Sequence, residues 1–160
     1  MNLTAPGVSQ LAFLPRVSKV GSDIQVKVLA DKIASGGGMF VGIIGRKISG
    51  HEYRTKVRID ANGSAHLYLT QIVGGTEATL QSASVPGLVV AAGDHLRLRM
   101  IVSGSAPTTL QTKVWRDGLV EPAGWLLTAV TQRRRCRDQV QPASWPFSGA
   151  RQETRLLWRD

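Results

Sequence analysis

The sequence predicts an all-β fold, an antiparallel β-sandwich of jelly-roll type. Three observations lead to this prediction. Short runs that alternate apolar and polar residues recur along the first 130 residues, long helical patterns are few, and most of the 17 glycines sit at turn positions. Roughly nine short strands separated by turn signals are typical of an antiparallel sandwich or jelly roll.

The clearest element is a predicted hairpin over residues 51–73. Its turn contains Asn62-Gly63, a strong hairpin signal because both residues tolerate the positive φ of a tight turn. One face of the hairpin is expected to meet a core and carries Tyr53, Thr55, Val57, Ile59, Ala65, Leu67 and Leu69. The other face meets water or a ligand and carries Arg54, Lys56, Arg58, His66, Tyr68 and Thr70.

Further strands follow from the same alternation and from the turns between them. We expect them at residues 8–14, 23–31, 39–47, 76–85, 95–102, 108–115 and 125–130, with a short apolar piece at 88–90. The run 39–47 contains two glycines, which suggests bulges or a close approach of the backbone. The triple glycine at 36–38 is interpreted as a turn, because no helix follows it to bind a phosphate.

Length and charge narrow the classes of partner. A chain of 160 residues is long enough for one domain with a real core. The formal charge of +9 divides into +5 from residues 1–130 (13 Lys+Arg, 8 acids) and +4 from residues 131–160 (7 Arg, 3 acids). A basic balance favours anionic partners. Nearly half of the excess lies in the final segment, so nucleic acid is not the expected partner.

Cysteine content and hydropathy add three expectations. The single cysteine, Cys136, excludes an internal disulfide or a zinc ribbon. The longest apolar stretch, residues 39–44, is far shorter than the roughly 20 residues of a membrane-spanning helix. Residues 1–3 lack the basic and apolar regions of a signal peptide, so no membrane insertion is expected and any export signal would lie outside this chain.

An ordered set of turn and strand residues supports a resemblance to a known family. The set comprises Asp31-Lys32, Ser35 to Gly38, Gly45-Arg46, Tyr53-Arg54, Asn62-Gly63, Val73 to Glu77, Pro86-Gly87-Leu88, Gly93-Asp94, Gly104 to Thr109, Lys113-Val114-Trp115, Gly118, Glu121-Pro122 and Trp125. Over about 120 residues, their order resembles the concanavalin A-like (laminin-G-like) jelly-roll domains of actinobacterial surface and secreted proteins and of actinobacteriophage tail proteins.

The resemblance implies a function and a location. It implies a non-catalytic accessory module of a larger extracellular, cell-surface or virion protein, with a polysaccharide or cell-surface glycan as the partner. Two alternatives stay open, a structural spacer domain without a ligand and a fragment of a concanavalin-like glycoside hydrolase. Some laminin-G-like domains bind calcium, so the resemblance alone implies calcium as a cofactor to consider.

The chain also departs from the family pattern at its ends. Family members have further strands before the position of Met1, and an acidic loop with at least two more strands after residue 130. Residues 131–160 are rich in Arg, lack Lys and show no alternation. We therefore divide the chain into a partial jelly roll, 1–130, and an irregular Arg-rich tail, 131–160, whose composition suggests an out-of-frame segment. Missing strands could be supplied by other domains or chains.

The polar face of the hairpin is the candidate ligand-binding surface. If the sheet is continuous, two further strands would extend this face. The candidate residues are Arg54, Lys56, Arg58, His66, Tyr68, Arg97, Arg99, Lys113 and Trp115. Tyr68 and Trp115 are the best candidates for stacking on sugar rings. The alternatives are an ordinary solvated sheet face and, for Trp115 and Trp125, a place in the core.

Catalytic and metal sites are not expected. The carboxylates sit in turns or at strand ends and never at i, i+2 along one strand, whereas a glycosidase needs two of them close together. The histidines, His51, His66 and His95, have no ligand-like spacing. Residues 60–63 superficially resemble a calcium loop, but the EF-hand spacing and its terminal Glu are missing, and the turn alone explains them. The basic run 133–137 is explained by composition rather than by nucleic-acid binding.

Overall fold

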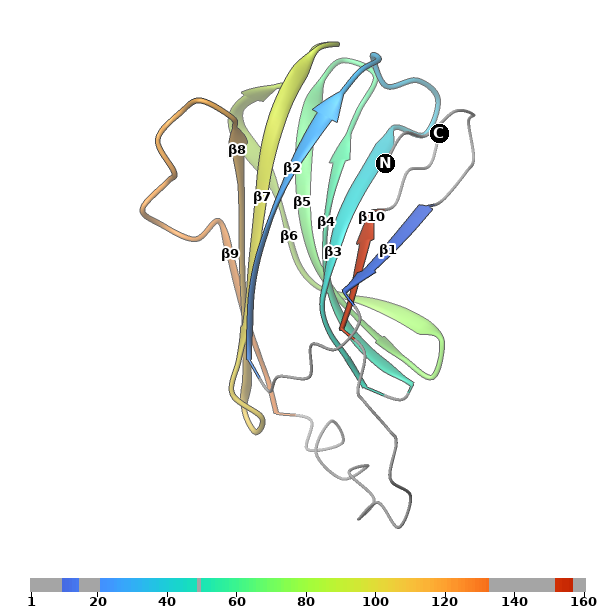
Figure 1. Ribbon diagram of the computed structural model, residues 1–160, viewed down its shortest axis with the longest axis vertical. Helices are drawn as coiled ribbons and strands as arrows, with labels where there is room; N and C mark the ends of the chain where they lie inside the picture. Colours follow the sequence, from blue (N-terminus) through green and yellow to red (C-terminus); the bar gives the residue numbers. More distant parts are fainter. Residues whose placement is uncertain (1–9, 15–20, 49, 133–151, 157–160) are drawn as a thin grey trace.

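The computed structural model describes residues 10–14, 21–48, 50–132 and 152–156, and the regular structure of these residues is entirely β (Figure 1). The strands are β1 (Gln10–Leu14), β2 (Ser22–Ala30), β3 (Met39–Ile48), β4 (His51–Ile59), β5 (Ser64–Val73), β6 (Thr76–Val89), β7 (Asp94–Ser103), β8 (Thr108–Arg116), β9 (Leu127–Thr131) and β10 (Gln152–Leu156). The all-β prediction is confirmed. The expected short piece at 88–90 forms the end of the long strand β6.

Two four-stranded antiparallel sheets pack face to face as a sandwich (Figure 1). One sheet has the order β2-β7-β8-β9 and the other the order β3-β4-β5-β6. A third pair, β1 with β10, is also antiparallel and lies beside β3 (Figure 1). Strand β10 lies within residues 131–160, the segment that was predicted from the sequence to be an irregular tail. Residues 133–151 of that tail, with Cys136 and the basic run, and residues 157–160 lie outside the described residues.

The predicted central hairpin is formed by β4 and β5 in the expected register. The pairing runs from His51↔Val73 to Ile59↔Ala65. At the turn, Gly63 adopts a φ of 80° and donates its N–H to the Asp60 carbonyl at 2.8 Å. The Asn62 side chain accepts the N–H of Ser64 at 2.9 Å, which satisfies a further main-chain donor in the turn.

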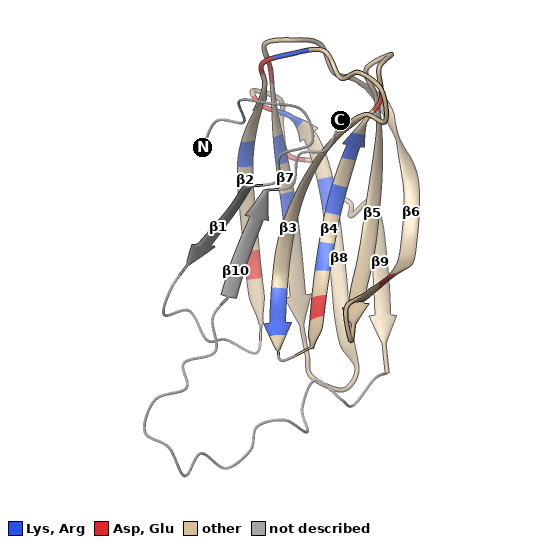
Figure 2. Ribbon diagram, turned by 90° about the vertical axis from the view of Figure 1, so that its right-hand side faces the viewer, with Lys and Arg blue, Asp and Glu red and all other residues tan. Residues whose placement is uncertain are grey.

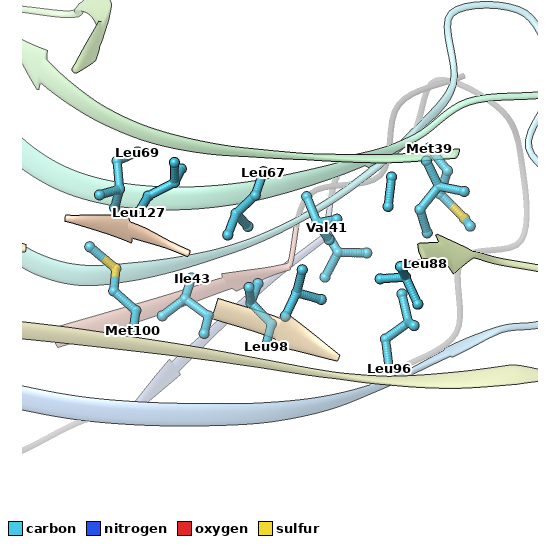
Figure 3. Close-up of a cluster of buried hydrophobic side chains, with 14 of the residues drawn as sticks. Met39, Val41, Ile43, Leu67, Leu69, Leu88, Leu96, Leu98, Met100 and Leu127 are labelled. Atoms are coloured by element: carbon cyan, nitrogen blue, oxygen red, sulfur yellow. The ribbon is translucent and has the colours of Figure 1, made fainter. Parts of the chain in front are cut away.

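The core fills the space between the inner faces of the two sheets (Figure 3). Alternation along each strand directs every second side chain inward. Among the most deeply buried residues are Met39, Val41, Ile43, Leu67, Leu69, Leu96, Leu98 and Met100. Burying one such side chain contributes about 1.5–3 kcal/mol, so this shared core holds the two sheets together.

Both glycines expected to mark irregularities in β3 lie against neighbouring atoms. The register with β4 shifts between Ile44 and Arg46, which places a bulge at Gly45. A Cβ on Gly45 would lie 2.6 Å from a methyl of Val102, and one on Gly42 would lie 2.8 Å from the Thr55 carbonyl oxygen. The interpretation of this run as bulged and closely approached is confirmed.

Candidate functional site

The candidate ligand-binding residues lie on two different sheets. Arg54, Lys56 and Arg58 on β4 stand opposite residues of β5, with Lys56↔Tyr68 and Arg58↔His66 as predicted. The other four candidates belong to β7 and β8, where Arg97↔Trp115 and Arg99↔Lys113 are cross-strand neighbours. The condition of one continuous sheet is not met, because β4-β5 and β7-β8 belong to opposite layers of the sandwich. The predicted set of nine is therefore two surfaces on opposite outer faces.

The cations on the β4-β5 face are paired with acids of the same chain. Lys56 Nζ lies 2.8 Å from Glu77, and Asp60 lies 2.8 Å from Arg58 Nε and 3.2 Å from His66 Nε2. Arg54 pairs with Glu52. Figure 2 shows the basic residues along β4 on this side of the molecule. Such a network of ion pairs is the ordinary state of a solvated antiparallel face, and Tyr68, half-buried, is its only aromatic candidate from the predicted set.

The β7-β8 face is organised by Arg99 and Asp117. Arg99 contacts Asp23 at 2.6 Å and Glu121 at 2.5 Å, while Asp117 contacts Lys27 at 2.6 Å and also pairs with Arg97. Hydrogen bonds from Lys27 and Arg97 lower the pKa of Asp117 to about 2. These carboxylates therefore stay ionised near neutral pH.

Lys113 fastens the connection between β8 and β9, residues 117–126, onto the outside of this sheet. Its side chain is nearly buried, and Nζ lies 4.5 Å from the centre of the Trp125 ring. The same ammonium donates to the Pro122 carbonyl at 2.6 Å and pairs with Glu121 at 2.7 Å. Hydrogen bonds from Lys113 and Arg99 lower the pKa of Glu121. A lysine held by a carboxylate, a carbonyl and an aromatic face has one clear function, which is to position this connection.

Trp115 is covered by that arrangement. It projects from β8 on the outer face, yet only 7% of its surface is exposed, and it lies outside the core cluster between the sheets. Trp115 thus lies on the predicted outer face and not in the core between the sheets, and its ring is nearly buried. It cannot offer a wide stacking surface. Trp125 is only partly buried and is the more accessible ring of the two.

A groove of about 400 Å³ opens beside these residues, where β8 continues past the end of β9. Strand β9 pairs only with Thr108–Thr112, so residues 113–116 of β8 have no strand on that side. The walls are mainly apolar and come from the end of β6, from β8 and from the connection, including Val85, Pro86, Leu88, Trp115, Leu119, Pro122 and Trp125. Among the described residues, the charged side chains that line the groove are Lys113 and Arg116.

This groove was not predicted from the sequence. Trp125 and Pro86 entered the sequence predictions as family-pattern residues, Trp125 also as a core candidate, and Leu119 had no predicted role. One sequence signal was present, because the connection 117–126 is long for a hairpin and ends with Pro122 and Trp125. That signal indicates a structured loop, but it does not show that the end of β6 forms the opposite wall.

The carboxylates of the sandwich are committed to ion pairs. Seven of them lie at ion-pair distance from a cation, namely Asp23, Glu52, Asp60, Glu77, Asp94, Asp117 and Glu121. Within the described ranges, no three His, Cys, Asp or Glu residues gather as a metal site would require. The described residues also contain no helix long and apolar enough to cross a membrane.

No protein-family model matches the chain, and a search of curated proteins finds no similar sequence. What the structure establishes is an all-β protein with two four-stranded antiparallel sheets packed as a sandwich.

Proposed function

We propose that the chain is a non-catalytic glycan-recognition module of a surface, secreted or phage-tail protein, built as a concanavalin A-like jelly roll. The groove beside Trp125 is its binding site. The observation that supports this most directly is a partly exposed tryptophan, fixed by Lys113 at 4.5 Å, at the wall of a groove of about 400 Å³. That volume falls within the roughly 300–1,000 Å³ of ligand pockets. The fold supports the class of function by analogy only.

The lining of the groove suits a sugar chain. Sugar rings present apolar C–H faces that pack on aromatic and proline rings, and Trp125, Pro86 and Pro122 supply such surfaces. Sugar hydroxyls need polar partners, and the partly exposed guanidinium of Arg116, which also donates to Asp94 and to the Val89 carbonyl, lies at the same site. Because Lys113 holds Trp125 in place before a ligand arrives, little side-chain ordering would be required on binding.

A hydrolytic function is less compatible with the described carboxylates. A glycosidase needs one carboxyl group whose pKa is raised so that it can donate a proton. Here the cations around Asp23, Asp117 and Glu121 lower the pKa of each carboxyl group. No described carboxylate lines the groove. These observations favour binding over a fragment of a hydrolase.

A binding screen with matched variants tests the proposal. The panel should include cellohexaose, chitohexaose, mannohexaose and laminarin, each titrated calorimetrically with and without calcium. Trp125→Ala should weaken binding at least about tenfold, equivalent to about 1.4 kcal/mol. Tyr68→Ala, on the opposite face, is the control and should bind as the wild type does.

Two results would contradict the proposal in different ways. Loss of binding in Tyr68→Ala but not in Trp125→Ala would move the site to the β4-β5 face. Absence of binding to every glycan at millimolar concentration would support the structural-spacer alternative, which the ion-paired outer faces favour.

A further inference from the structure

We propose that the main chain of Val114 and Arg116 forms the hydrogen-bonding edge of the groove, and that it binds an unbranched sugar chain lying along β8. This inference rests on the proposed glycan function and specifies the ligand further. The main-chain contact follows from the direction in which alternate peptide groups of β8 point.

The ladder between β7 and β8 determines those directions. Asp117 donates its N–H to the His95 carbonyl at 2.8 Å, in register with the pair Leu96↔Arg116. In an antiparallel ladder, the N–H and C=O of every second residue face the same neighbouring strand. The odd-numbered residues of β8 therefore face β7, and the even-numbered residues face β9. The bond from Leu126 N to the Thr112 carbonyl, 3.1 Å long, agrees with this parity.

The pairing with β9 stops at Thr112↔Leu127, two residues before Val114. The N–H and C=O of Val114 and the N–H of Arg116 thus point to a strand position that β9 does not fill. The remaining group, the Arg116 carbonyl, accepts the N–H of Leu119 at 3.2 Å. Within residues 21–48 and 50–132, the other three groups have no hydrogen-bond partner on that side.

Val114 is sheltered from bulk water, Arg116 is partly exposed, and both border the groove. Val114 is 4% exposed and is one of the groove-lining residues. A buried main-chain group without a partner costs about 1–3 kcal/mol, so a ligand that supplies a partner gains affinity. Hydroxyl groups both donate and accept, and so match an edge that offers N–H, C=O and N–H in turn.

The shape of this site favours an unbranched chain. A ligand on the vacant position lies where a strand would, about 4.8 Å from β8. The end of β6, at Pro86 and Gly87, and the connection at Gly124 and Trp125 border the same groove. A branch on the sugar backbone would meet one of these walls.

The free protein provides the first test, by amide hydrogen exchange measured residue by residue. The amides of Val114 and Arg116 should exchange at least about tenfold faster than those of Lys113 and Trp115, which face β7. Equally slow exchange at all four amides would overturn the inference without any ligand, because the strand edge would then be closed.

The second test uses oligosaccharides with a common backbone. Cellohexaose is compared with a xyloglucan heptasaccharide, and mannohexaose with its galactosylated form. The unbranched member should bind at least about tenfold tighter and should slow exchange at Val114 and Arg116. If sugars bind without protecting these amides, or if the branched forms bind equally well, the inference fails while the glycan function stands. If no sugar binds, the proposed function fails with it.

A blocking variant links both readouts to the groove. A Cβ at Gly124 would meet no atom within 4 Å, and this glycine does not need a positive φ, so Gly124→Leu should fold and fill the groove. Ala123→Leu, which places the same leucine side chain at an exposed neighbour outside the lining, is the matched control. Sugar binding and amide protection should be lost in Gly124→Leu only. Unchanged binding in that folded variant would place the ligand elsewhere and overturn the inference.

Discussion

The hydroxyl oxygens of Thr55 and Thr112 lie 2.9 Å apart in the core and join β4 of one sheet to β8 of the other. Both residues are fully buried. Thr55 is also 3.1 Å from the Tyr68 carbonyl, and Thr112 is 2.9 Å from the Arg99 carbonyl. Two hydroxyl hydrogens serve these three contacts, so each threonine can still donate to a carbonyl when the other is lost.

A double-mutant cycle at this pair should therefore be close to additive. Thr55→Val and Thr112→Val should each lower the free energy of unfolding by about 1 kcal/mol, because each removes one buried hydrogen bond. The double variant should lose about the sum, since each substitution removes one hydroxyl hydrogen and the remaining threonine still donates to its own carbonyl. Urea unfolding of the four proteins measures this. A loss in the double variant well below the sum would show that the contact between the two hydroxyls adds stability of its own.

The bulge at Gly45 should tolerate no side chain. In Gly45→Ala the new methyl would meet Val102 at 2.6 Å and the Met100 sulfur at 2.9 Å. Such overpacking should lower the free energy of unfolding by about 1–3 kcal/mol. Gly124→Ala is the control, because its Cβ would contact nothing within 4 Å. Thermal unfolding compares the two, and equal melting temperatures would contradict the assigned packing.

Arg46 should stabilise the sandwich because its side chain donates a hydrogen bond to a backbone carbonyl. Its guanidinium donates to the Gly104 carbonyl at 2.9 Å and to Thr108 Oγ1 at 3.2 Å, and the residue is 5% exposed. Arg46→Met should cost about 2 kcal/mol, since a charged hydrogen bond is lost and its acceptor is left without that donor. Lys47→Met, next to it and half-exposed, should stay within about 0.5 kcal/mol of the wild type. An equal loss of unfolding free energy in both variants would show that the buried hydrogen bonds of Arg46 add no more stability than the half-exposed Lys47 side chain does.

The ionisation of Asp117 should make the free energy of unfolding depend on pH below about pH 5. Its pKa falls from 3.8 to about 2 on folding, so the ionised form stabilises the folded state. That contribution is complete above about pH 5 and disappears as the pH falls toward 2. The difference in unfolding midpoint between the wild type and Asp117→Asn should therefore shrink over this range. A difference that stays constant from pH 7 to pH 2 would show that the pair with Lys27 and Arg97 contributes nothing through charge.

The local pattern of the chain was sufficient to predict the strands of the two four-stranded sheets, but not β10. Period-two alternation determines which side chains share a face, and Asn62-Gly63 determines where the hairpin turns. For this reason the register Lys56↔Tyr68 and the inward position of Thr55 could be predicted from neighbouring residues alone. The glycines inside β3 were also informative, because only a residue without a Cβ fits a close contact.

The tertiary structure alone decided how the strands divide between two sheets. Alternation does not show which distant strands pair, since that depends on contacts between residues far apart in the sequence. Arg99 and Lys113 could thus be placed on an outer face, but not on the layer opposite Arg54. The groove has the same origin. It exists because β9 begins only at Leu127, opposite Thr112, and because the end of β6 approaches the second half of β8. No local pattern in the sequence determines that meeting.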